Sequence, residues 1–203
     1  MALTALAFNC TLKPSPESSS TEKLGRELLD ALAGHGVTGE LVRAVDHDIK
    51  PGVQTDMGDG DAWPSLREKV LAADILVFAT PTWMGRSSSV ARRVIERLDA
   101  ELSETDAEGR PSMFGKVAIL AVVGNEDGAH EITAEVYQAL SDVGFTIPGQ
   151  GVTYWNGESM ATTDYIDLPT TPEATAGTTK TAAANAAHLA GLLAASNYPV
   201  PES

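Results

Sequence analysis

The stretch DILVFATPTWMG occupies residues 74–85 and indicates the fold class of the whole chain. Its first seven residues are almost continuously apolar, which is typical of a strand buried on both faces of a parallel sheet. A proline, a tryptophan and a glycine follow directly. We therefore expect Pro81 to end the strand and residues 81–87 to form a loop at its carboxyl end.

Similar apolar runs recur along the chain and alternate with helical patterns. Leucines spaced four residues apart, at Leu24, Leu28 and Leu32, are typical of one face of a helix, which Gly34 would end. Alternation of this kind predicts an α/β fold in which helices cover both faces of a parallel sheet. Strands are expected at 3–9, 40–45, 74–80 and 116–123, with an interrupted fifth within 145–154, and later helices at 64–72, 87–100, 132–143 and 181–195.

Composition limits the possible partners. A chain of 203 residues with 43% hydrophobic residues can bury a substantial core, so we expect a single domain over 1–203, with a polar, irregular segment at 156–179 before the C-terminal helix. The net charge of −14 argues against nucleic acid and anionic membrane, because the long-range field repels polyanions. Residues 1–12 are apolar but lack a basic region and are too short to cross a bilayer, so a cytoplasmic protein is expected.

The segment after the first strand is rich in hydroxyl groups. Residues 10–21 read CTLKPSPESSST. Hydroxyls, free amides and the helix dipole at a helix N-terminus can hold a phosphate dianion, and Lys13 adds one cation. Alternatively, Ser20 or Thr21 is only a helix N-cap. Neither a glycine–lysine phosphate loop nor GxGxxG is present, which disfavours nucleoside triphosphates and the usual dinucleotide fold.

Two further loops follow buried strands. PTWMGRSSS, residues 81–89, places Trp83 and Met84 where a flat apolar ring can pack, although Trp83 also suits a core or an interface. GNEDGAH, residues 124–130, is a flexible turn with Asn125 available for hydrogen bonds. Its acidic residues and His130 lack the spacing of metal ligands, so no metal site is expected. A long acidic loop, 46–61, is either a lid or a solvated connection.

Cys10 is the only cysteine, which excludes an intramolecular disulfide and a thiolate metal cage. It follows the first strand, as the nucleophile of low-molecular-weight phosphatases does. The C-x5-R loop of those enzymes needs an arginine six residues further on, where this chain has Pro16. We therefore interpret Cys10 as a small buried residue.

Three segments in this order resemble the NADPH-dependent FMN reductase and WrbA-type flavoprotein family over about residues 3–155. They are NCTLKPSPESSSTEKL, ATPTWMGRSSSVARRVIERLD and VVGNEDGAHE. The resemblance implies a flavodoxin-like, doubly wound sheet of five parallel strands in the order 2-1-3-4-5. Asn9 and Cys10 replace the usual glycine and serine at the start of the first loop, and two prolines lengthen that loop.

The resemblance also implies where flavin mononucleotide (FMN) lies. Its phosphate would be surrounded by Thr11, Lys13, Ser18, Ser20 and Thr21. Its isoalloxazine ring would be bordered on one side by Pro81, Thr82, Trp83, Met84 and Gly85, and on another by Gly124, Asn125 and Gly128. No side chain is assigned as a catalytic acid or base, because the flavin carries the redox chemistry.

The implied activity is that of an FMN-containing oxidoreductase. It would pass electrons from NAD(P)H to a quinone, a second flavin or another small acceptor, and would form a homodimer or homotetramer. The alternative is a flavodoxin-like electron carrier without substrate turnover, which would share the fold, the acidic surface and the flavin. The short threonine–glycine–threonine phosphate loop of flavodoxins is absent, which favours the enzyme.

Overall fold

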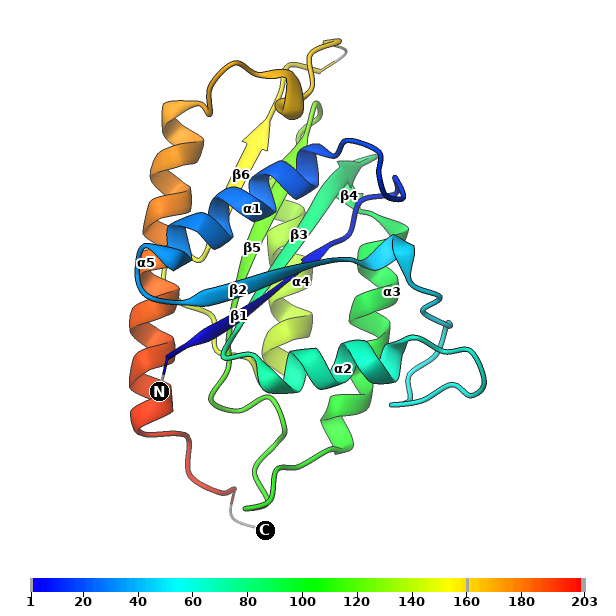
Figure 1. Ribbon diagram of the computed structural model, residues 1–203, viewed down its shortest axis with the longest axis vertical. Helices are drawn as coiled ribbons and strands as arrows, with labels where there is room; N and C mark the ends of the chain where they lie inside the picture. The colour runs from blue at the N-terminus through cyan, green and yellow to red at the C-terminus, as the bar shows by residue number, and fades with distance from the viewer. Residues whose placement is uncertain (1, 160, 202–203) are drawn as a thin grey trace.

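A parallel sheet lies between two layers of helices in the computed structural model, which describes residues 2–159 and 161–201 (Figure 1). Its neighbouring strands follow the order β2-β1-β3-β5-β6 and are all parallel. The strands are β1 (Thr4–Asn9), β2 (Thr38–Arg43), β3 (Ile75–Trp83), β5 (Val117–Gly124) and β6 (Val152–Asn156). The short β4 (Arg86–Ser87) pairs antiparallel with β3, off this path, so the predicted order 2-1-3-4-5 is confirmed.

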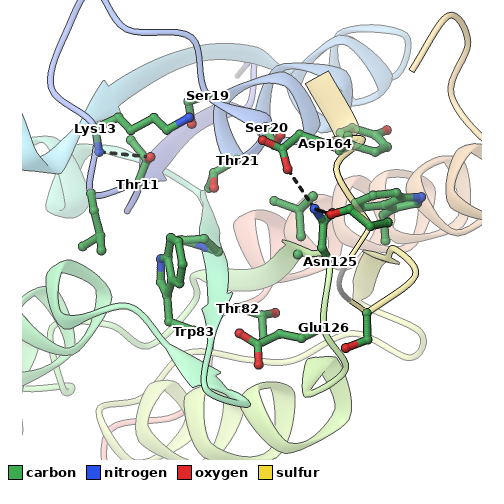
Figure 2. Close-up of a pocket in the computed structure, with 18 residues that line it drawn as sticks. Thr11, Lys13, Ser19, Ser20, Thr21, Thr82, Trp83, Asn125, Glu126 and Asp164 are labelled. Carbon is green, nitrogen blue, oxygen red and sulfur yellow. Dashed lines mark hydrogen bonds between the residues drawn. The ribbon is translucent and has the colours of Figure 1, made fainter. Parts of the chain in front are cut away.

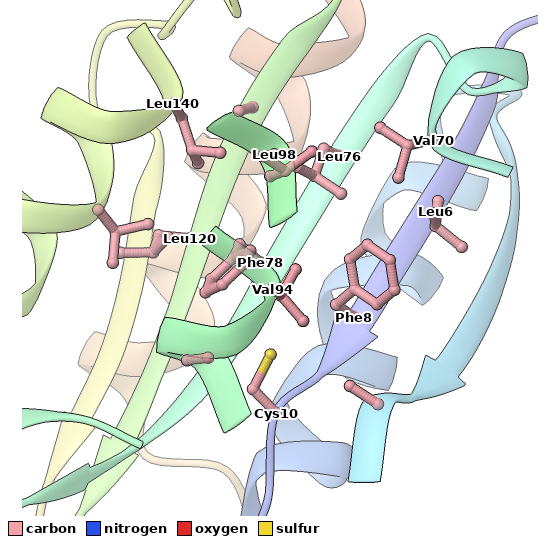
Figure 3. Close-up of a cluster of buried hydrophobic side chains, with 14 of the residues drawn as sticks. Leu6, Phe8, Cys10, Val70, Leu76, Phe78, Val94, Leu98, Leu120 and Leu140 are labelled. Atoms are coloured by element: carbon pink, nitrogen blue, oxygen red, sulfur yellow. The ribbon is translucent and has the colours of Figure 1, made fainter. Parts of the chain in front are cut away.

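The two faces of the sheet are covered by different helices. One face packs against α1 (Ser20–Ala33) and α5 (Glu173–Ala195). The other packs against α2 (Trp63–Ala72), α3 (Ser89–Leu98) and α4 (Ala129–Asp142). Successive strand residues alternate between these layers because side chains of a strand point to opposite faces. In Figure 3, Leu6, Phe8, Leu76, Phe78 and Leu120 lie on the face covered by α2, α3 and α4.

Strand β3 continues past Pro81, so the expected end of the strand at that residue is wrong. Pro81 is in register with Val123 of β5, and the strand runs on to Trp83. The carbonyl of Ala79 accepts a hydrogen bond from the Cys10 N–H on the β1 side, and the Pro81 nitrogen, two residues on, faces that same side. Because β1 has ended there, the missing N–H of proline breaks no ladder hydrogen bond.

Other boundaries also differ from the expectation: β2 is Thr38–Arg43 and not 40–45, and β6 is Val152–Asn156, so it extends beyond 145–154. Two further differences lie in α1 and α5. The N-cap of α1 is Ser19, whose hydroxyl accepts from the Glu22 N–H at 3.2 Å, and not Ser20 or Thr21. Helix α5 begins at Glu173, so the last part of the segment expected to be irregular is helical. Its threonines suit a helix here because two of them, Thr175 and Thr179, face the sheet and hydrogen-bond with Thr153 or the Tyr154 carbonyl.

The acidic loop after β2 is fixed by a buried ion pair. Arg97 of α3 donates to Asp61 at 2.7 Å, and both side chains are fully buried. Arg97 also donates to the carbonyls of Lys50 and Gln54. Asp61 in turn accepts from the backbone N–H groups of two loop residues, Lys50 and Met57, and of Trp63, the first residue of α2. The loop is thus held against α3 by these hydrogen bonds.

No helix within the described residues combines the length and the apolar character needed to cross a membrane.

Candidate functional site

A cavity of about 410 Å³ lies at the carboxyl ends of β1, β3 and β5 (Figure 2). At this edge of the sheet, the chain that leaves β1 leads to β2 on one side, and the chain that leaves β3 leads to β5 on the other. Doubly wound sheets bind ligands at such a reversal of strand order. The lining residues come from four segments: Thr11, Leu12, Lys13, Ser19, Ser20 and Thr21; Pro81, Thr82 and Trp83; Val123, Gly124, Asn125 and Glu126; and Trp155, Ser159, Ala161, Asp164 and Tyr165.

Most of the residues expected at the flavin site line this cavity. They are Thr11, Lys13, Ser20, Thr21, Pro81, Thr82, Trp83, Gly124 and Asn125. Four others lie outside the lining. Ser18 borders a separate surface depression on the outer side of α1, and Met84, Gly85 and Gly128 form the turns behind the cavity wall.

The first loop is ordered by its own polar side chains. The Asn9 carboxamide oxygen accepts from the Thr11 N–H at 3.1 Å, and the Thr11 hydroxyl accepts from the Lys13 N–H at 3.3 Å. Ser19 then caps α1. Within the described part of the chain, no hydrogen bond engages the N–H groups of Ser20 and Thr21. These two amides and the ammonium group of Lys13 make this end of the cavity suited to an anion.

The Ser20 side chain has a hydrogen-bond partner that the sequence did not indicate. Its hydroxyl oxygen accepts a hydrogen bond from the Ile166 N–H at 3.1 Å. The Ser20 hydroxyl therefore ties α1 to the segment after β6, and its own hydrogen remains for a ligand. Ser19 and Ser20 both line the cavity, whereas the expected Ser18 does not.

The second loop is a tight hairpin between β3 and β4. Met84 (φ 52°) and Gly85 (φ 72°) both lie in the left-handed region, as the two central residues of a type I′ turn do. The Met84 N–H donates to the Glu126 carboxylate at 2.8 Å. A Cβ on Gly128 would lie 2.9 Å from the backbone of Gly85, so the hairpin rests directly on the β5–α4 turn. Trp83 is about half exposed at the mouth of the cavity.

A further wall of the cavity, not expected from the sequence, comes from the end of β6 and the segment between β6 and α5. Asn125 donates to the Asp164 carboxylate at 2.9 Å and to the Ala161 carbonyl at 3.4 Å, so it holds this wall in place (Figure 2). The rings of Trp155 and Tyr165 lie 5.5 Å apart within the wall. Two aromatic residues in an otherwise polar segment were the signal in the sequence.

Helix α1 holds this wall from behind. Lys23 donates to the carbonyls of Tyr165 (3.0 Å) and Leu168 (3.3 Å), and its ammonium group lies over the Tyr165 ring. The Tyr165 hydroxyl donates to Glu27. Burial, and next the hydrogen bond to the Glu27 carboxylate, raise the pKa of Tyr165, so it stays a neutral donor at physiological pH.

Two candidate reactive groups have structural surroundings. Cys10 is fully buried with its thiol in the core, and burial raises the pKa of that thiol (Figure 3). It is therefore a poor nucleophile, as we expected. His130 packs edge-on against Tyr154, with ring centroids 5.3 Å apart.

The cavity fits a phosphorylated flavin by two independent features. Among the described lining residues, Lys13 is the only cation, and the Glu126 carboxylate lies on the opposite side of the cavity from it, near Thr82 (Figure 2). The Thr82 hydroxyl is buried in the wall and has no hydrogen-bond partner among the described residues. A buried polar atom without a partner is costly, so a ligand with polar ring edges suits this wall.

Comparisons with known proteins give a consistent result. A family model described as NADPH-dependent FMN reductase matches residues 4–159. The 8-demethyl-8-aminoriboflavin-5'-phosphate synthase of Streptomyces davaonensis is 35% identical over 177 residues, which are 82% of this chain and 68% of the relative. The divalent metal cation transporter MntH of Mycobacterium bovis is 41% identical over 169 residues, 81% of this chain. The chain spans 25% of the length of that transporter.

A solved structure extends the likeness over nearly the whole chain. The crystal structure of RosB with the bound intermediate 8-demethyl-8-formylriboflavin-5'-phosphate superimposes with a TM-score of 0.87 at 33% identity. The match covers 97% of this chain and 82% of that one.

Proposed function

Because this chain belongs to the NADPH-dependent FMN reductase family and is therefore an FMN-containing oxidoreductase, we propose that its cavity of about 410 Å³ is the FMN site. The observation that carries this proposal is the meeting, in one cavity, of a helix N-terminus with free amides and the ends of β3 and β5. The first suits a phosphate, and the second suits a flat ring.

The phosphate would be held by the hydroxyls of Thr11, Ser19 and Thr21, the ammonium group of Lys13, and the Ser20 and Thr21 amides. The ring would be held by Pro81, Thr82 and Trp83 on one side and by Gly124 and Asn125 on another. When bound, FMN supplies hydride acceptance and one- or two-electron transfer. The chain's own part is to bind, orient and partly shield the flavin.

We infer that NAD(P)H is the electron donor and that a quinone, a flavin or another small molecule is the acceptor. The half-exposed Trp83 leaves the mouth of the cavity open to such molecules. Anaerobic stopped-flow mixing of the FMN-loaded protein with each nucleotide tests this inference. Loss of the oxidised flavin band within seconds and its recovery on adding a quinone are expected; a flavin indifferent to both nucleotides would point to an electron carrier.

A second candidate function follows from the relatives named above. The curated relative at 35% identity is named for a ring-modified riboflavin phosphate as its product, and the solved structure at 33% identity holds another as a bound intermediate. The same cavity would then take flavin phosphate as its substrate. Converting a ring methyl into a formyl or amino group requires an oxidant and, for the amine, a nitrogen donor, so FMN is incubated with the protein, dioxygen and an amino acid before mass spectrometry. An unchanged FMN mass under these conditions supports the reductase, and a modified ring supports the synthase.

We also propose that the chain is a single domain that assembles as a homodimer or homotetramer. Leu12 and Trp83 line the cavity, and Met84 follows Trp83 in the β3–β4 hairpin; all three are large apolar side chains exposed to solvent, Met84 by 89%. Exposed apolar side chains of this size favour an interface. Light scattering coupled to size-exclusion chromatography tests this, with a monomeric mass as the contrary result.

A further inference from the structure

Arg43 stands at the end of β2, in register with Asn9, where the first loop leaves β1. Its side chain is only 9% exposed and does not line the cavity. One guanidinium nitrogen donates to two loop carbonyls, that of Lys13 at 3.2 Å and that of Glu17 at 2.9 Å. The other nitrogen donates to the Glu22 carboxylate on the first turn of α1. Arg43 thus joins both ends of the loop to the helix.

We propose that Arg43 is the positioning residue that makes the first loop selective for phosphorylated flavin. This proposal rests on the proposed FMN site. A carbonyl oxygen that faced a phosphate dianion would repel it, and the carbonyls of Lys13 and Glu17 are instead held by Arg43, behind the loop. The peptide conformation fixed in this way presents the Lys13 side chain and the α1 amides to the cavity.

Charge balance supports the same assignment. Glu22 lies in the first turn of α1, which also carries the free amides of Ser20 and Thr21. Its negative charge would repel a phosphate bound at those amides. Burial by itself raises the pKa of Glu22, but hydrogen bonds from Arg43 and from Arg26 outweigh it and hold that pKa below its usual value. Glu22 is therefore ionised, and the two arginines compensate its charge.

The experiment measures dissociation constants for FMN and for riboflavin in the wild-type protein and in Arg43→Met. Riboflavin lacks the phosphate, so the ratio of the two constants reports on the phosphate end alone. Loss of charge-assisted positioning is expected to weaken FMN binding about 10- to 100-fold, and riboflavin binding by less than about threefold. Equal weakening of both ligands would overturn the proposal and make Arg43 a purely structural brace.

Two further variants separate the causes. The double variant Arg43→Met/Glu22→Gln also removes the Glu22 carboxylate that Arg43→Met leaves uncompensated. If the contacts of Arg43 with the Lys13 and Glu17 carbonyls matter, the preference for FMN over riboflavin stays lost in the double variant. Full recovery of that preference would assign the effect to charge alone and contradict the proposal. Arg43→Lys keeps the charge but lacks the guanidinium fork, so an intermediate ratio is expected. Arg43→Lys also serves if the methionine variant fails to fold.

Asp46→Asn is the matched control. Asp46, which follows β2, also holds the first loop: its carboxylate accepts from the Ser15 N–H at 2.8 Å and from the Ser15 hydroxyl at 2.5 Å. Unlike the contacts of Arg43, these lie at the exposed tip of the loop. Its ligand ratio is expected to equal that of the wild type, and a loss as large as that of Arg43→Met would refute a specific role for Arg43. Failure of the wild-type protein to prefer FMN would instead refute the proposed function.

Discussion

Substituting Arg97 by methionine should strongly destabilise the protein while leaving the cavity intact. Arg97 and Asp61 are both fully buried and are 2.7 Å apart. Removing one partner of a buried ion pair leaves an uncompensated charge and costs about 3–5 kcal/mol. For a domain of this size, that corresponds to a fall in melting temperature of about 6–20 °C.

The matched control is Arg93→Met on the same helix. Arg93 is partly exposed and donates to one carbonyl, that of Ile49, at 2.6 Å. Losing such a contact should cost about 1 kcal/mol. Chemical denaturation of the two variants and the wild-type protein gives the comparison. Equal, small losses in both variants would refute the role assigned to the buried pair.

The same pair makes a prediction about acid. Burial alone raises the pKa of Asp61, but hydrogen bonds from the Met57 N–H and from Arg97 outweigh it and lower the pKa to about 2. Because the folded-state pKa lies below the unfolded value, this contribution is complete above about pH 4 and is lost as the pH falls toward 2. Stability of the wild-type protein should therefore fall more steeply over this range than that of Arg97→Met.

Three other outcomes are expected. Gly128→Ala should weaken flavin binding by displacing the hairpin, because its Cβ would meet the Gly85 backbone at 2.9 Å and its φ is +138°; unchanged affinity would show that the hairpin tolerates the shift. Ser19→Ala should cost about 1 kcal/mol through loss of the N-cap, with Ser18→Ala nearly neutral in the same denaturation assay. Cys10 should resist iodoacetamide in the folded protein at pH 8 and react once unfolded, since it is fully buried; rapid labelling of the folded protein would contradict this.

The positions of most strands could be predicted because they depend on local signals, whereas the strand order and the residues of the flavin site were implied by the family resemblance. Continuous apolar runs identify strands buried on both faces, and the loops that follow them converge at one edge of the sheet. The N-cap was expected at Ser20 or Thr21, one or two residues after the actual cap Ser19, because serine and threonine at neighbouring positions are all suitable caps. Only the geometry of the chain selects Ser19.

The position of the cavity wall between β6 and α5 could not be predicted, for a different reason. The segment from residue 157 to residue 168 has no hydrophobic period, and its position depends on contacts with distant residues. Lys23 and Glu27 on α1 hold Tyr165, and Asn125 holds Asp164. Such hydrogen bonds between distant segments leave no periodic trace in the sequence.

Titration of flavin-free protein with FMN, followed by calorimetry, tests the central claim most directly. The arrangement of Lys13, the α1 amides and the unpartnered Thr82 hydroxyl predicts one saturable site per chain, with FMN bound more tightly than riboflavin. Absence of saturable heat with FMN, or equal affinity for the two flavins, would contradict the account.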